Sequence, residues 1–473
     1  MRPKLLLLGL MAALIPGPAL ATGSEPHTAA PLPPLVYLGL AVGTLALIVF
    51  ASLKVEKLSA KVALFLSIGA STYAFLHFSG GAEDVLHHVY HVDYPQFIMI
   101  PALTLLMASM NLLKLKVDDD FKPGWLMWIT IPIIGNFATT WSLVPIAVSL
   151  FPVLKKRYPQ DYWTKMILMF IFGANILALG TVLADPPQAY WAVQLGNAGT
   201  PMSFFYPISQ FWLFILLTWL LYGAMLKHIG VEFGDFNLRA ILPRFESIGN
   251  VLLAIAISGC LAYALLALKG YEITIFLGVV FVATFALAMS RGKEVRHNTV
   301  HWCSETFTIF IAFFAVVSFM HVMLENMTIT NELMVGFVMG LTWMADNAAA
   351  FAAGYPQFAG NEQLMLWYNL HPSVTQGSMT PLGNGPQIVT FLVIFTAMGH
   401  VSAGQVFREW FKVGWIFAPY LLVWTFAAMA LHGNMTMVNQ LLTGVVAITV
   451  SFAFMWFAET TFNVTPRQKS QHR

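Results

Sequence analysis

Long apolar stretches separated by short polar segments run along the chain from Leu35 almost to its C-terminus. Most of them approach the roughly 20 residues that an α-helix needs to cross the hydrocarbon core of a bilayer. Two of these stretches, residues 166–186 and 371–398, contain helix-breaking residues. The pattern predicts an all-α polytopic membrane protein with about 11 transmembrane helices. The uninterrupted stretches are residues 35–53, 62–78, 97–113, 208–225, 248–268, 273–289, 307–324, 413–431 and 441–457.

Lysine and arginine residues between the apolar stretches predict the topology, because these residues are enriched in cytoplasmic loops. Basic residues lie on both sides of the apolar stretch 125–154, with Lys122 before it and Lys156 after it. This stretch should therefore enter and leave on the cytoplasmic side, as a re-entrant hairpin that turns near Asn136. A second hairpin is expected over residues 333–358, which are flanked by acidic residues and should open from the outside.

Both halves of the chain then show the same order of three spans, a hairpin, an interrupted span and one more span. Because a hairpin does not cross the membrane, each half crosses it an odd number of times, and the two repeats should be inverted. The predicted units are a first transmembrane repeat at residues 35–227, a cytoplasmic linker at 228–245, a second, inverted repeat at 246–432 and an extra C-terminal helix at 437–460.

The N-terminal residues 1–21 are typical of a cleaved signal peptide, in which a basic start precedes a short apolar run and small residues. Arg2 and Lys4 supply the basic start, and Ala21 ends the segment. The alternative is an uncleaved first helix. In either case Thr22 should lie outside, and the basic residues after the last span place the C-terminus in the cytoplasm.

Polar and helix-breaking residues interrupt the apolar pattern at corresponding places in the two halves. The first half contains GNFATTW at residues 135–141 and LADPPQ at 183–188, and the second contains ADNAAAF at 345–351 and PLGNGPQ at 381–387. Backbone groups left unpaired at membrane depth are tolerated only where they line a cavity enclosed by protein. Such interruptions in inverted repeats indicate the substrate site of a secondary transporter, near the bilayer midplane.

Composition agrees with the membrane class. Charged residues make up only 10% of the chain and apolar residues 58%, whereas roughly 25% of the residues in soluble domains are charged. The formal net charge of +2 gives no reason to expect nucleic acid as a partner. Cys260 and Cys303 form no CxxC motif and predict neither a disulfide framework nor a zinc site. The 14 tryptophans and 38 phenylalanines are expected to face lipid or to anchor the interface.

The hairpin turns and the paired segments GTVLADPPQ (180–188) and GSMTPLGNGPQ (377–387) resemble those of the ion transporter superfamily, most closely its NhaD-like Na⁺/H⁺ antiporters. That superfamily also includes arsenite efflux carriers and sodium-coupled dicarboxylate or citrate carriers. The resemblance covers residues 97–431 in organisation, but the Ser-Asn-Thr hairpin turns of the dicarboxylate symporters are absent. It implies a multi-pass protein of the bacterial cytoplasmic (inner) membrane that transports Na⁺ and H⁺ without a cofactor, with a homodimer left open.

A cation antiporter needs a group that binds either the cation or a proton, because this competition couples the two fluxes. Burial of a carboxyl group raises its pKa toward physiological pH, and ionisable residues within spans are functional candidates. Asp185 and Asp346, one from each half, are the candidates for this role. The alternative for each is a helix cap, at the outer surface for Asp185 and at the second arm of the hairpin for Asp346.

Neutral oxygen atoms would complete the site, because hard cations prefer oxygen ligands. We expect Na⁺ to be held by Asp346, Asn347, Asn136 and Asp185. An alternative for the threonines near the first turn is a hydrogen bond within their own helix. The candidate neutral ligands are Asn136, Thr139, Thr140, Asn347 and Asn384, with Asn175 as a supporting group.

The sequence predicts a transporter rather than an enzyme. It contains no HExxH motif, no Cys-His pair within the spans and no phosphate-binding loop that would indicate a primary pump. The leading prediction is a Na⁺/H⁺ antiporter whose partners are small ions and the lipid bilayer. The alternative is a sodium-coupled symporter or exporter of an organic or inorganic anion, for which neutral or cationic turns would be expected, since a carboxylate repels an anion.

Overall fold

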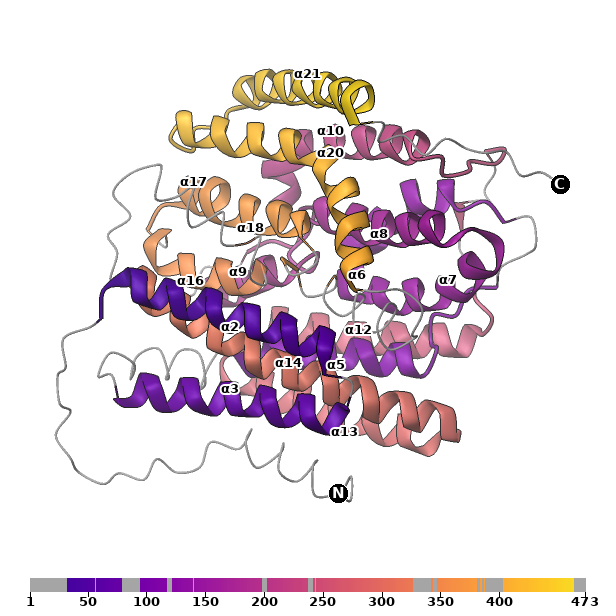
Figure 1. Cartoon of the computed structure of the whole chain (residues 1–473), viewed down its shortest axis with the longest axis vertical. Helices are drawn as coiled ribbons and strands as arrows, with labels where there is room; N and C mark the ends of the chain where they lie inside the picture. Colours follow the sequence, from indigo (N-terminus) through magenta and orange to yellow (C-terminus); the bar gives the residue numbers. More distant parts are fainter. Residues whose placement is uncertain are drawn as a thin grey trace.

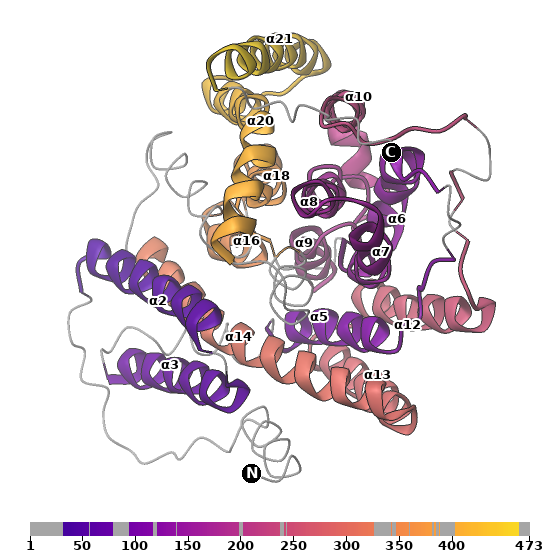
Figure 2. The same cartoon turned by 45° about the vertical axis from the view of Figure 1, so that its right-hand side comes forward.

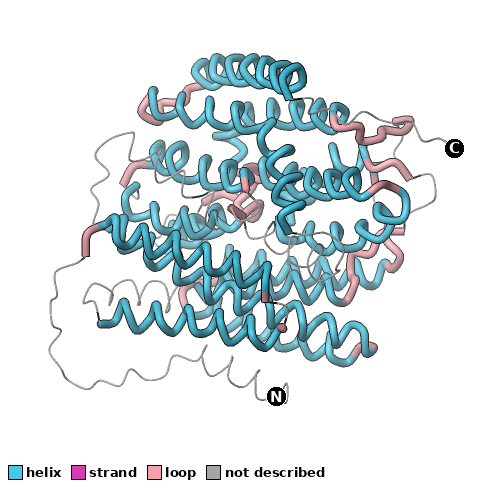
Figure 3. Tube along the Cα trace, viewed as in Figure 1, coloured by secondary structure: helices cyan, strands magenta, loops and turns pink. Residues whose placement is uncertain are grey.

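In the part of the chain that it describes, the computed structural model consists of helices joined by loops and turns, with one isolated β-bridge (Figures 1 and 3). Five helices in this part are long and apolar enough to cross a membrane, namely α3, α10, α12, α13 and α21. The fold is therefore that of an all-α membrane protein. The described residues are 32–55, 57–78, 94–116, 121–138, 140–197, 202–236, 241–242, 244–325, 342, 347–358, 360–380, 383–384, 387 and 403–462.

A group of long helices forms the lower part of the molecule in Figure 1. Helix α14 packs along α2, α3 and α5, while α13 packs against α5 and α12. The rings of Phe75 and Phe319 meet edge to face with centroids 5.9 Å apart and join α3 to α14. The bounds are α2 (Pro34–Lys54), α3 (Leu58–Phe78), α5 (Tyr94–Ser109), α12 (Ile248–Ala267), α13 (Tyr271–Ser290) and α14 (Lys293–Glu325).

Helix α14 is longer than the apolar pattern predicts, because it begins at Lys293 instead of residue 307. The polar first half of α14 is stabilised by buried contacts, which a hydropathy pattern does not show. The Thr299 hydroxyl is fully buried and lies 2.7 Å from that of Ser109 on α5, and Trp302 and Cys303 are also buried. Lys and Glu are good helix formers, so the helix also includes the polar residues that precede its apolar stretch.

Short helices and turns fill the middle of the molecule. In Figure 2, α16 and α18 stack beside α8 and α9, and the contacts of α16 with α9 and of α18 with α8 join the two halves of the chain. The first-half elements are the π-helical turn η2 (Leu126–Thr130), α6 (Ile131–Ala138), the 3₁₀ turn η3 (Thr140–Ser142), α7 (Leu143–Arg157), α8 (Gln160–Ile176) and α9 (Pro186–Asn197). The second-half elements are α16 (Asn347–Phe358), α17 (Glu362–Leu364), the π-helical turn η4 (Met365–Leu370), α18 (His371–Gln376) and the 3₁₀ turn η5 (Gly377–Met379).

The segment from η2 to α7 folds back on itself. Its two ends meet where Arg157 Nη1 donates to Phe121 O at 2.5 Å. Reciprocal hydrogen bonds hold the start of the segment to α10: Trp128 Nε1 donates to Trp219 O at 3.0 Å, and Trp219 Nε1 donates to Trp128 O at 2.8 Å. The indole rings are stacked with centroids 4.8 Å apart. The base of the segment is thereby fixed, and hydrogen bonds of Asn136 and Thr140 hold its other end against the break after α8.

The upper part of the molecule in Figure 1 consists of α10 (Tyr206–His228), α20 (Ala403–Ala430) and α21 (Met437–Phe462). Helix α20 packs against α21 on one side and against α8 and α18 on the other. Trp424 of α20 is fully buried and contacts the rings of Phe214 and Trp367. Helix α20 therefore links the outer helix α21 to the central elements.

The expectation that the tryptophans face lipid is wrong for many of them. Trp212 and Trp456 are exposed, as expected, but others have packed into the interior. A buried indole N–H usually has a hydrogen-bond partner, and Trp410 has one, because its Nε1 donates to Ser378 O at 3.1 Å. The buried tryptophans are Trp141, Trp163, Trp191, Trp302, Trp367, Trp410 and Trp424.

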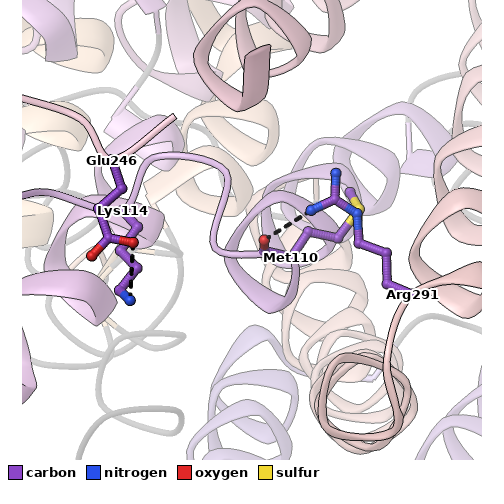
Figure 4. Close-up of polar contacts among 4 residues, drawn as sticks. All are labelled: Met110, Lys114, Glu246 and Arg291. Carbon is purple, nitrogen blue, oxygen red and sulfur yellow. Dashed lines mark hydrogen bonds and ion pairs between the residues drawn. The ribbon is translucent and has the colours of Figure 1, made fainter. Parts of the chain in front are cut away.

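A polar contact joins the end of α5 to the segment that precedes α12 (Figure 4). Glu246 N donates to Lys114 O at 3.0 Å, and the side chains of the same two residues form an ion pair of 3.1 Å. Arg291 Nη1 donates to Met110 O at 3.4 Å. Because the ion pair is half exposed and such pairs contribute little, the backbone contacts are the main link.

Candidate functional site

The break between α8 and α9 positions Asp185 inside the protein. The chain leaves the helix after Ile176 and runs through turns until α9 begins at Pro186. Proline is tolerated in the first turn of a helix because it has no N–H to leave unpaired. Asp185 immediately precedes α9, its backbone oxygen accepts from Gln188 N at 3.1 Å, and its side chain is only 1% exposed. It is thus both a helix-start residue and a buried carboxylate.

Donors from both halves of the chain converge on this carboxylate. Thr140 Oγ1 donates to Asp185 Oδ1 at 2.8 Å, and Asn347 Nδ2 donates to Asp185 Oδ2. Thr140 is held in place by its own N–H, which donates to Ala184 O at 2.9 Å. Asn347 is the first residue of α16 and is fully buried. The structure therefore brings together Asp185, Thr140 and Asn347, three of the candidate residues, and Thr140 donates to Asp185 at the break instead of within its own helix.

Asn136 occupies a different place from the one expected. Its Nδ2 donates to Pro132 O at 2.8 Å and to Leu177 O at 2.9 Å, and its Oδ1 accepts from Gly180 N at 2.6 Å. A Cβ on Gly180 would lie 2.4 Å from this Oδ1, so the contact requires glycine. The hydrogen bonds of the Asn136 side chain all go to backbone atoms, and they join the end of α6 to the break after α8.

The second break has equally close backbone contacts. A Cβ on Gly383 would lie 2.1 Å from Gly377 O, and one on Gly377 would lie 3.0 Å from Asn347 Cβ. Only glycine permits such an approach. Gly377, the first residue of η5, therefore lies directly against Asn347, which donates to Asp185. Asp346 and Thr139 lie outside the described residues.

Several amide oxygens near these breaks are buried without a hydrogen-bond partner among the described residues. They include Asn347 Oδ1 and Asn384 Oδ1, each on a fully buried residue. A buried polar atom without a partner costs about 1–3 kcal/mol, and an ion or a water is one of the partners that can meet such an atom in native proteins. Asn347 and Asn384 are accordingly suited to contribute neutral oxygens to a cation.

Two glutamines that were not among the residues predicted from the sequence form hydrogen bonds with the backbone at the breaks. Gln188 Nε2 donates to Ala178 O at 2.6 Å. The Gln387 amide, with its nitrogen toward Thr380, donates to Thr380 O at 2.7 Å and accepts from Asn175 Nδ2 at 2.8 Å. The signal that could have found them is the Pro-Gln pair that ends both GTVLADPPQ and GSMTPLGNGPQ.

Asp185 also lines a cavity of about 420 Å³ that extends along α12. Within the described part of the chain, no group of three or more His, Cys, Asp or Glu side chains gathers as a metal site. The site therefore offers one carboxylate together with neutral oxygens, which suits a weakly held monovalent cation or a proton. In comparisons with known proteins, no family model matches the chain and no curated protein matches it.

Proposed function

We propose that the chain is a secondary active transporter that exchanges Na⁺ for H⁺ across the bacterial inner membrane. The observation that carries the proposal is the burial of Asp185 at a break between two helices, with donors from both halves on its carboxylate. An ionisable side chain inside an apolar membrane protein is costly and is generally retained for function.

Matching contacts support the assignment of two inverted repeats. Asn136 lies against Gly180 at the start of the first break, and Asn347 lies against Gly377 at the start of the second. The meeting of Arg157 with Phe121 supports a re-entrant hairpin in the first repeat. We infer about 11 transmembrane helices around these elements, with the N-terminus outside and the C-terminus in the cytoplasm.

Coupling follows from competition at one carboxylate. When deprotonated, Asp185 offers negative oxygens to Na⁺, and the unpartnered oxygens of Asn347 and Asn384 are available as neutral ligands. When Asp185 carries a proton, it becomes a hydrogen-bond donor with less acceptor capacity and no longer attracts the cation. The site holds one or the other, so movement of the site across the membrane exchanges them. Asp346 is a second carboxylate that we propose for the same exchange.

The charge at the site favours a cation over an anion as substrate. A buried carboxylate facing an anion would repel it, and Asp185 is the ionisable residue toward which Thr140 and Asn347 converge. The resemblance of the two breaks to NhaD-like antiporters supports the same choice. We therefore rank anion symport below cation antiport.

The test is ion-driven dissipation of an imposed pH gradient in proteoliposomes. Asp185→Asn should abolish Na⁺-dependent proton release, because an amide cannot exchange a proton. Asp235→Asn is the matched control, since Asp235 is an exposed aspartate in the loop that follows α10. Antiport by the Asp185→Asn protein at the wild-type rate would overturn the proposed role of this carboxylate.

A further inference from the structure

The cavity beside Asp185 is larger and more apolar than a cation site requires. Its volume of about 420 Å³ corresponds to roughly a dozen water molecules at about 30 Å³ each, and it falls within the usual range of small-molecule pockets. Ala254, Leu261 and Leu265 of α12 form one wall, and Ile134 and Ile146 of the folded-back segment contribute to the other. Apolar walls of this kind do not retain water well.

Asp185 is the only ionisable residue among the described residues that line this cavity. Asp185 lines it together with Pro186, and Leu113 and Phe245 line it from the junction of α5 and α12. The cavity thus combines one buried carboxylate with an elongated apolar body. A ligand that matches it has a positive group at one end and a hydrocarbon or aromatic body.

The rim of the cavity faces the apolar surface of the molecule. Ile255 is 60% exposed and Phe137 is 53% exposed, and both line the cavity. The neighbouring Leu252 is exposed on the same helix, so this side of α12 is suited to contact lipid. A ligand that partitions into the hydrocarbon therefore has direct access to the cavity.

We infer that this cavity is a binding site for a lipophilic primary ammonium ion, with the ammonium group on the Asp185 carboxylate and the apolar body along α12. An ammonium group supplies three N–H donors, and charge-assisted hydrogen bonds to a buried carboxylate are the strong ones. Binding requires only the buried carboxylate and the cavity. Competition between such an amine and Na⁺ rests in addition on the proposed function.

The test compares 4-phenylbutylammonium with the neutral alcohol 4-phenylbutanol, which has nearly the same shape. Equilibrium binding of the labelled amine to the full chain in lipid nanodiscs is measured at neutral pH, with empty nanodiscs subtracted. We expect the amine to bind about tenfold to a hundredfold more tightly than the alcohol, and Asp185→Asn to remove this preference. Equal binding of amine and alcohol to the wild-type protein would overturn the inference and identify the cavity as a site for neutral acyl chains.

A cavity-filling variant tests the location independently of the charge. Gly259 lines the cavity, and a Cβ placed on it meets no atom within 4 Å, so Gly259→Phe adds a ring without a backbone clash. Gly278 on α13 is equally open but does not line the cavity, which makes Gly278→Phe the matched control. Gly259→Phe should weaken amine binding at least about tenfold while Gly278→Phe leaves it unchanged. Equal binding by the two monodisperse variants would place the amine elsewhere and overturn the inference.

Competition with Na⁺ separates this inference from the proposed function. Asp185-dependent amine binding that Na⁺ does not displace would support the cavity site and count against a cation site at Asp185. Na⁺/H⁺ exchange in proteoliposomes without amine binding would refute the cavity site alone.

Discussion

Replacement of Thr140 by valine isolates one hydrogen bond at the buried carboxylate. Valine has nearly the shape of threonine, and Thr140 is only 1% exposed, so the change removes the hydroxyl with little change in packing volume. The lost contact is the 2.8 Å donation from Thr140 Oγ1 to Asp185 Oδ1. Asn347 still donates to the other carboxylate oxygen, so Asp185 should remain in place.

The expected change in Na⁺ affinity follows from the difference in free energy between a hydrogen bond to a charged acceptor and one to a neutral acceptor. A bond to a charged acceptor contributes about 1.5–3 kcal/mol and one to a neutral acceptor about 0.5–1.5 kcal/mol. Removing the Thr140 donor therefore costs the cation-binding, ionised form about 1 kcal/mol more than the protonated form. This difference raises the half-saturating Na⁺ concentration about fivefold at a pH where H⁺ competes.

The assay is the Na⁺ dependence of pH-gradient dissipation in proteoliposomes, with Thr140→Ser as the control because serine keeps the hydroxyl. We expect Thr140→Ser to stay close to the wild-type protein and Thr140→Val to show the rise. The reasoning is refuted if valine and serine give the same half-saturating concentration, since the hydroxyl would then have no part in cation binding.

Three further predictions concern the turn, the second carboxylate and the topology. Gly180→Ala should lower the stability of the detergent-purified protein by about 2 kcal/mol, because its Cβ would displace Asn136 Oδ1 and break two hydrogen bonds; in the Asn136→Ala background the same change should cost almost nothing, and additive effects in thermal unfolding would show that the two residues are not coupled. Asp346→Asn should insert normally but fail to couple cation flux to proton flux in proteoliposomes; antiport at the wild-type rate would remove Asp346 from the exchange. A cysteine at position 156, made by Lys156→Cys, should be inaccessible to an impermeant reagent added outside intact cells, because the proposed topology places both ends of the folded-back segment on the cytoplasmic side; labelling from outside would contradict the hairpin.

Local chemistry in the sequence was sufficient to predict the helical membrane class and the position of the first break. The apolar stretches required helices, and the Pro186-Pro187 pair after Asp185 required a new helix start. The basic residues around the segment 125–154 predicted that its two ends lie on one side, and Arg157 does meet Phe121. Each of these expectations rests on the residue types along one continuous stretch of the chain, which is why a linear pattern can show it.

Contacts between distant residues were decided only by the tertiary structure. Asn347 and Asp185 are 162 positions apart, and no periodicity in either half indicates that the Asn347 amide, rather than Asn136, reaches the carboxylate. Asn136 instead satisfies backbone groups freed by the break at Leu177 and Gly180, a demand that exists only once the helix has ended there.

The hydropathy pattern gave wrong expectations for side chains that are buried against other parts of the protein instead of facing lipid. In the polar start of α14, the Thr299 hydroxyl forms a hydrogen bond with that of Ser109 on α5. In the interior, Trp410 donates a hydrogen bond to the backbone oxygen of Ser378. An apolar pattern records how much a residue gains by leaving water, but it does not record which neighbour will meet its polar atoms. The apolar pattern and the Pro186-Pro187 pair were therefore enough to predict the class of protein and the first break, whereas the packing of the two halves places Thr140 and Asn347 around Asp185.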